Sequence, residues 1–273
     1  MSAMGAIVRK ELRDAARSRW LVGFAGTFAL TALALSLAQS RGGDAAGQGF
    51  TRTTAGLVNL CLLLVPLLAL SLGAGSVAGE RERGTLASLL SQPISTTELL
   101  LAKYVGLVLA VWAAIALGFG TAGVVLALVS PMAGMAEYFQ FTLLSAGLAA
   151  TMLSLGMLIS VWSDGRMKAL AMAIVLWFVL VLFYDFAAIG IALSVSSSGR
   201  TLLLAVLANP VEGARILAIV GLEPDLRVLG PLGSYLVNEM GVTTTTVLLV
   251  GALTAWTAAP LALAARVFAR QDC

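Results

Sequence analysis

Two long apolar runs of this sequence are separated by the stretch Gly79-Glu80-Arg81-Glu82-Arg83-Gly84-Thr85-Leu86. Four consecutive charged side chains are too costly to place in hydrocarbon, so this stretch is expected to be a loop outside a bilayer that both runs cross. From the last residue of this stretch onward, Leu86, Leu89 and Leu90 have the spacing of one apolar face of a short helix, which Pro93 ends. A charged amphipathic helix at a membrane surface is typical of a docking element. It indicates a protein that transmits a signal rather than one that performs bond chemistry.

The composition indicates a polytopic membrane protein. Of its 273 residues 59% are hydrophobic and only 11% are charged, with a mean hydropathy of +0.97. Soluble domains carry about 25% charged residues. The chain has no histidine, the commonest general base and metal ligand, and no Gly-x4-Gly-Lys-Ser/Thr motif for binding ATP. We therefore expect no catalytic residue, metal site or cofactor in this chain, and the net charge of +3 does not indicate a nucleic-acid partner.

Six apolar runs are long enough to cross a bilayer as helices, which takes about 20 residues each. The first run is longer than the roughly 7–15 residues of a signal peptide and its flank mixes acids with bases, so we expect an uncleaved span. The predicted fold is an all-α integral membrane domain over residues 1–273. The six runs are Trp20 to Ala38, Leu57 to Ala78, Tyr104 to Val129, Phe139 to Val161, Ala169 to Leu193, and Thr245 to Ala265.

Lysine and arginine side chains set the expected orientation, because cytoplasmic loops are enriched in them. They concentrate before the first run, between the second and third, between the fourth and fifth, and after the sixth. Both termini and the charged stretch are therefore expected on the cytoplasmic side. The domain then divides into an interfacial helix (1–19), spans one to five (20–193), an extracytoplasmic helical segment (194–244), and span six with a cytoplasmic tail (245–273).

The segment 201–220 is apolar enough to be a seventh span. Asn209-Pro210 interrupts it, and Glu212 and Arg215 lie near its middle, which makes a crossing costly. We expect instead two short helices that dip into the outer face or lie on it. Glu212 and Arg215 are three residues apart and can pair on one helix face. The pair is either a local surface contact or a lock that holds the two short helices.

The N-terminal segment is predicted to be an amphipathic helix in the plane of the membrane interface. It is either a topology anchor or a surface helix that frames a docking site together with the charged stretch. Further along, Ser95 and Glu98 have the spacing of a capping box, which predicts the start of the helix that runs into the third span. The basic residues on the polar face of the N-terminal helix are Arg9, Lys10, Arg13 and Arg17.

The apolar runs contain further features with more than one interpretation. Asp185, near the outer end of span five, is either interfacial or functional. Cys61 and Cys273 are expected on opposite sides of the membrane, too far apart for a disulfide. Small residues recur at every fourth position in two spans, which suits either packing within the chain or a dimer seam. They are Gly106, Ala110, Ala114, Gly118 and Ala122 in the third span, and Gly251, Ala255 and Ala259 in the sixth.

The charged stretch, with Leu89-Leu90, Pro93 and Lys103, resembles the signature of type-2 ABC exporter permeases. The opening Arg9-Lys10-Glu11-Leu12-Arg13-Asp14 with Arg17-Ser18-Arg19-Trp20 is also similar to that family, as is Asn209-Pro210 with Glu212 and Arg215 before the last span. The resemblance covers the whole chain. Within the family, the chain resembles the permeases that serve maturation of the copper sites of nitrous oxide reductase.

The resemblance implies partners and roles that the composition does not indicate. It implies a homodimer in the bacterial inner membrane, bound to a cytoplasmic ABC ATPase dimer that holds ATP and Mg, and to a periplasmic β-helical protein. The N-terminal helix would be a connecting helix. The resemblance also implies that the ATPase contacts a coupling helix formed by Glu80, Arg81, Glu82, Arg83, Gly84, Thr85, Leu86 and Leu89.

Other functions stay open at the level of sequence. A permease of this family can instead export a lipid, a drug or a peptide. A stand-alone secondary carrier needs buried coupling carboxylates or broken-helix ion sites, and Asp185 is the one carboxylate inside a predicted span. The long outer segment 194–241, with the loop 39–56, is either a docking platform for the extracytoplasmic partner or a cap over the outer mouth of a dimer.

Overall fold

The computed structural model describes residues 3–16, 22–23, 26–27, 29–31, 48–90, 94–129, 135–184, 186, 199–222, 226 and 229–271. Most of the predicted first span, together with Arg17, Pro93 and Asp185, lies outside these residues, so the predictions for them are not tested. Every regular element of the described part is helical. The helices are α1 (Ala3–Ala16), α3 (Gln48–Glu82), α4 (Thr85–Leu90), α5 (Thr96–Val129), α6 (Met135–Trp162), α7 (Arg166–Trp177), the π-helix η1 (Phe178–Phe183), α9 (Gly199–Ala208), α10 (Pro210–Leu222), α11 (Pro231–Tyr235), the π-helix η3 (Leu236–Met240) and α12 (Val242–Ala269).

The all-α membrane architecture is confirmed. Within the described residues, five helices are long and apolar enough to cross a bilayer, and they correspond to the predicted spans two to six. A sixth crossing would count only if the bent pair α9 and α10 were taken as one span. The five helical spans are Asn59–Glu82, Thr96–Thr121, Tyr138–Trp162, Arg166–Phe183 and Val242–Ala269.

The charged stretch is mostly helical and not a loop, which corrects the sequence analysis. α3 continues past its predicted end at Ala78 through Glu82, and only Arg83-Gly84 forms a turn before α4. Gly84 has a φ of 69°, a left-handed conformation that favours glycine. α5 begins at Thr96, as the predicted capping box of Ser95 and Glu98 requires, and runs into the apolar stretch that starts at Tyr104. Both helices extend beyond their apolar runs because charged side chains at their ends bond to neighbouring helices.

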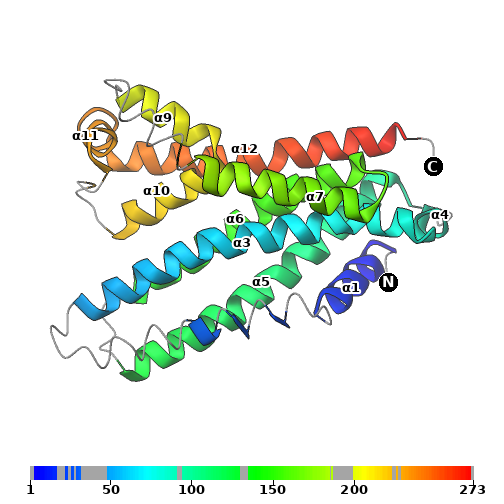
Figure 1. Cartoon of the computed structure of the whole chain (residues 1–273), viewed down its shortest axis with the longest axis horizontal. Coiled ribbons are helices and arrows are strands. Elements are labelled where there is room, and N and C mark those ends of the chain that lie inside the picture. Colours follow the sequence, from blue (N-terminus) through cyan, green and yellow to red (C-terminus); the bar gives the residue numbers. More distant parts are fainter. Residues whose placement is uncertain are drawn as a thin grey trace.

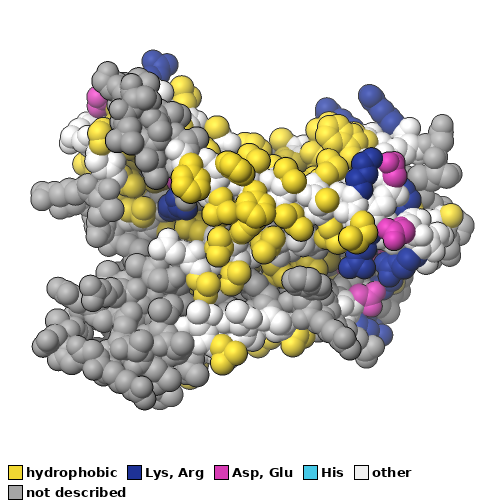
Figure 2. All heavy atoms as spheres, in the orientation of Figure 1, with side chains coloured by type: hydrophobic (Ala, Val, Ile, Leu, Met, Phe, Trp, Pro, Cys, Tyr) yellow, Lys and Arg dark blue, Asp and Glu magenta, His cyan; other side chains and the backbone are white. Residues whose placement is uncertain are grey.

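The long helices run along the length of the molecule, and its two ends differ (Figure 1). α1, α4 and the C-terminal end of α12 lie at one end, which we term the α4 end. α9 and α11 lie at the opposite end, termed the α9 end. On the face drawn in Figure 2, hydrophobic side chains cover the middle, and Lys, Arg, Asp and Glu side chains gather mainly at the α4 end. The middle of the molecule therefore suits the hydrocarbon of a bilayer.

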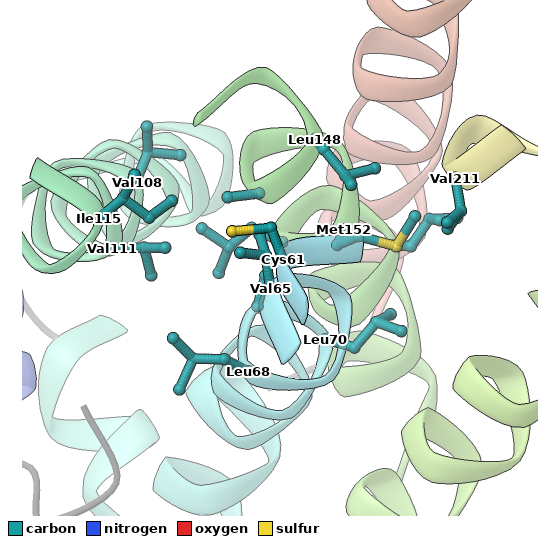
Figure 3. Close-up of a cluster of buried hydrophobic side chains, with 14 of the residues drawn as sticks. Cys61, Val65, Leu68, Leu70, Val108, Val111, Ile115, Leu148, Met152 and Val211 are labelled. Atoms are coloured by element: carbon teal, nitrogen blue, oxygen red, sulfur yellow. The ribbon is translucent and has the colours of Figure 1, made fainter. Parts of the chain in front are cut away.

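The core forms where α3 and α6 cross at a backbone contact. A Cβ atom added to Gly73 would lie 2.6 Å from the Leu153 carbonyl oxygen, and one added to Gly156 would lie 2.5 Å from that of Leu70. Small residues allow such close approach of helices in membranes. Side chains of α3, α5, α6 and α10 fill the space around this crossing (Figure 3). They include Cys61, Val65, Leu68, Val108, Val111, Ile115, Leu148, Met152 and Val211.

The small residues of the third span pack within the chain. Gly106 faces α1, and a Cβ atom there would lie 2.7 Å from the Cβ of Glu11. In contrast, Gly251 and the other two small residues of α12 are exposed. Packing within the chain is therefore confirmed for the third span, and a dimer seam along α12 stays a prediction. The further buried members of the α5 stripe are Ala110, Ala114 and Gly118.

The segment 201–220 forms the predicted pair of short helices. α9 and α10 are bent by 118° at the single residue Asn209 between them. The predicted pair of Glu212 and Arg215 forms on α10, with 2.6 Å between Oε1 and Nη1. Pro210 occupies the first position of α10, where its missing N–H costs no helical hydrogen bond.

Candidate functional site

A short exposed helix at the α4 end matches the predicted docking element. After the turn Arg83-Gly84, Thr85 and Ala87 are exposed and Leu89 is half-buried. Leu86 is different, because it belongs to a buried cluster of its own chain. Leu86 therefore packs against its own chain, and its contact with a partner stays a prediction. Among the described side chains, the surface available to a partner includes the turn and the other three residues.

Glu80 is buried and bonds to lysines of two other helices. Its Oε1 lies 2.8 Å from Nζ of Lys103 on α5 and 3.0 Å from Nζ of Lys10 on α1. Nζ of Lys103 also lies 2.7 Å from Oε1 of Glu11 on α1. Only 3% of Glu80 and 1% of Lys103 is exposed. The carboxylate of Glu80 is therefore used inside the chain, and its contact with a partner stays a prediction.

The residues Lys10, Glu11, Glu80 and Lys103, termed the charge quartet, carry two positive and two negative charges. Glu11, Glu80 and Lys103 are buried, whereas the side chain of Lys10 is 48% exposed. Balanced charge makes the burial of those three tolerable, because each charge removed from water faces an opposite one. Partial burial acts to lower the pKa of Lys10, but the hydrogen bond and charge of Glu80, and then the charge of Glu11, outweigh it and raise that pKa. Lys10 therefore stays charged at neutral pH.

Sequence reasoning missed the pairing roles of Glu11 and Lys103. In the sequence, these two residues stand out only as parts of the family resemblance. The available signal was that Lys103 directly precedes the apolar run at Tyr104, where a charge needs a partner. The partner was not identifiable, because Lys103 and Glu11 are 92 residues apart in the chain.

Arg81 holds the end of α6 and the C-terminal segment. Its Nη1 donates to the carbonyl oxygens of Ser163 at 2.7 Å and Val161 at 3.3 Å, and its Nη2 donates to Oε1 of Gln271 at 2.6 Å. Nε2 of Gln271 in turn donates to the Val161 carbonyl at 3.0 Å. The last carbonyls of a helix have no partners within the helix, so a cation there is stabilising.

Glu82 bonds to the beginning of α7. Its Oε2 accepts the backbone N–H of Arg166, the first residue of α7, at 2.7 Å. The residue before the helix, Gly165, has no side chain that can cap it. A carboxylate from α3 therefore supplies the anion that a helix N-terminus favours.

Three consecutive residues in the last helical turn of α3, Glu80, Arg81 and Glu82, thus bond to most of the elements at the α4 end. We term these three residues the charged turn. Glu80 bonds to α1 and α5, Arg81 to the end of α6 and the C-terminal segment, and Glu82 to α7. α4 follows this turn after two residues. A displacement of α4 therefore acts directly on residues that bond to four other helices.

α1 is amphipathic as predicted, but it packs on protein along its inner face. Ile7 and Glu11 are buried, and Arg9 and Arg13 are exposed. The inner face rests on α5, where Gly106 leaves room for it. The framing role beside the charged turn fits this position, and contact of the exposed arginines with lipid head groups stays a prediction.

The predicted capping box at the start of α5 is confirmed. The backbone N–H of Ser95 donates to Oε2 of Glu98 at 2.9 Å, and the N–H of Glu98 donates to Oγ of Ser95 at 3.2 Å. The cap fixes the start of α5 at Thr96, shortly after the end of α4 at Leu90.

The outer candidate residues lie apart from this site. Asn209, Pro210, Glu212 and Arg215 belong to the hairpin of α9 and α10, so the structure does not bring them together with the charged turn. Among the described residues, no group of three or more His, Cys, Asp and Glu side chains could hold a metal ion.

Comparison with known proteins decides the family. Residues 5–273 match the family described as ABC-2 family transporter protein. The chain belongs to this family of ABC transporter permeases. The permease is similar to two proteins, each named probable ABC transporter permease protein NosY. It is 34% identical to the one from Pseudomonas aeruginosa and 32% identical to the one from Stutzerimonas stutzeri, each over 99% of both chains. The resemblance to type-2 permeases is confirmed, and the permease is a multi-pass membrane protein.

Proposed function

We propose that this permease couples ATP hydrolysis by a separate cytoplasmic ATPase dimer to movement across the membrane. Two copies of the permease would form the transmembrane part, and ATP and Mg would bind to the ATPase. The observation that carries this proposal is the connection of the exposed helix α4 to the charged turn, which bonds to α1, α5, α6 and α7. The ATPase would contact Arg83, Thr85, Ala87 and Leu89.

For the process that this movement serves, we propose maturation of the copper sites of nitrous oxide reductase. Full-length similarity to two permeases named NosY supports this assignment. A periplasmic β-helical protein would dock at the α9 end. Relay of movement is favoured over conduction, because the predicted spans contain Asp185 as their one carboxylate and no Lys or Arg.

The variant Ala87→Asp is expected to reduce co-purification of the ATPase at least tenfold, with membrane insertion unchanged. Ala87 is exposed on α4, so the change does not affect the core, but it places a carboxylate in the contact. An unpaired buried charge costs more than about 1–3 kcal/mol, and 1.4 kcal/mol is a factor of ten. The copper content of nitrous oxide reductase from the same cells should fall in parallel.

The matched control is Thr97→Asp, which adds the same charge to an exposed residue at the α4 end outside α4. It should leave both measurements unchanged. Retention of the ATPase by Ala87→Asp would show that α4 is not the contact. Loss of the ATPase with normal copper content would keep the coupling role and reject the copper assignment.

The proposed orientation places the α4 end in the cytoplasm of a bacterium and the α9 end outside its inner membrane. Ser234→Cys, on an exposed residue of α11, should react with an impermeant thiol reagent added to intact spheroplasts. Asp164→Cys, exposed between α6 and α7, should react only after the membrane is opened. Labelling of residue 164 from outside would reverse the orientation.

A further inference from the structure

The hairpin of α9 and α10 breaks at a buried residue. Asn209 is 1% exposed, although the chain bends there by 118°. α10 also packs against α3, α6, α12 and η1. A helix break away from water leaves backbone groups that must find partners inside the protein.

Side chains supply those partners. Oδ1 of Asn209 accepts the N–H of Val211 at 3.0 Å, as an N-cap for α10. The indole N–H of Trp256 on α12 donates to the Leu207 carbonyl at 3.0 Å, near the end of α9. The remaining donor, Nδ2 of Asn209, bonds to the carbonyl of Leu180 at 2.7 Å. Asn209 therefore caps α10 and also binds a residue of the preceding span.

Leu180 lies in the π-helix η1, where the N–H four residues later bonds to a different carbonyl. The N–H of Tyr184 bonds to the carbonyl of Val179, five residues earlier. In an α-helix the same N–H would bond to Leu180, four residues earlier. A change of η1 from π to α geometry would therefore bring a second donor, the N–H of Tyr184, to the carbonyl that accepts from Asn209, and would change the geometry of that bond.

The other end of the same span bonds to the charged turn. α7 begins at Arg166, whose N–H donates to Glu82, and it continues directly into η1. From Arg166 to Leu180 the helix covers roughly 20 Å, at about 1.5 Å per residue. The continuous helix of α7 and η1 thus connects Glu82, at the end of α3, with Asn209, at the break between α9 and α10.

We propose that α7 and η1 form a relay in which Glu82 and Asn209 are the positioning residues at its two ends. Movement of the charged turn shifts the N-terminus of α7, η1 changes its hydrogen-bond register, and the Leu180 carbonyl releases or binds the hairpin. The direction of this relay rests on the proposed function. The mechanical connection does not, since it is a property of the permease alone.

The test measures hydrogen exchange of the hairpin amides, residues 199–222, in the permease alone in lipid nanodiscs. Asn209→Ser keeps an oxygen that caps α10 but is too short to reach Leu180, and it should raise hairpin exchange about tenfold. Glu82→Ala, at the far end of α7, should raise it at least threefold. The double variant should exchange no faster than Asn209→Ser, because the connection is already broken.

Asp164→Ala is the matched control, because it removes an exposed carboxylate beside α7 whose ion pair is with Lys168, four residues away. It should leave hairpin exchange unchanged. Faster exchange at residues 166–170 in Glu82→Ala with an unchanged hairpin would overturn the relay, and so would additive effects in the double variant. Binding of the ATPase does not enter this measurement, so failure of the relay is distinct from failure of the proposed function.

Discussion

Replacement of Lys103 by methionine is expected to destabilise the permease by about 3–5 kcal/mol, the usual cost of removing one partner of a buried ion pair. Lys103 is 1% exposed and its Nζ lies 2.7 Å from Glu11 and 2.8 Å from Glu80. The variant leaves both carboxylates buried against one remaining cation, Lys10. Chemical unfolding in mixed micelles measures the loss.

Two further variants isolate the charge effect. Lys168→Met breaks an exposed ion pair with Asp164 and should leave stability nearly unchanged, because water already solvates both charges. The double variant Glu11→Gln with Lys103→Met removes one charge of each sign, so it should recover more than half of the loss. Equal stability of the Lys103 and Lys168 variants would mean that the quartet does not hold α1 on α3 and α5.

Gly156→Ala is expected to destabilise the permease by about 1–3 kcal/mol, the typical cost of overpacking. The added Cβ would lie 2.5 Å from the Leu70 carbonyl oxygen and 3.0 Å from the Cα of Gly73. Both atoms belong to backbone, so no side chain can turn away, and α3 and α6 must separate. Because the charged turn ends α3, ATPase stimulation should fall together with stability.

Gly251→Ala makes the same chemical change in a membrane helix, where no described atom beyond the adjacent turns of its own helix backbone lies within 4 Å of the new Cβ. There the substitution should be neutral or stabilising by up to about 1 kcal/mol, since glycine is costly inside a helix. A similar loss in both variants would show that glycine flexibility, and not the crossing, is what matters at Gly156.

The sequence alone predicted the helical spans that the structure describes, because hydrocarbon admits only elements that satisfy their own backbone. Runs of about 20 apolar residues therefore determine helices of known length. Features within a few residues of each other were predictable for the same local reason. The Ser95–Glu98 capping box, the break at Asn209-Pro210 and the Glu212–Arg215 pair all lie where the sequence placed them.

Tertiary structure decided which charges face a partner and which are used inside. Glu80 and Leu86 belong to one charged amphipathic stretch, yet both are buried, and Ala87 between the expected contacts is exposed. Glu80 meets Lys10 from 70 residues away, and Glu82 meets Arg166 from 84 residues away. The physical reason is that a charge in a sequence shows the need for a partner, while the packing of α1, α5 and α7 around α3 determines which partner it finds.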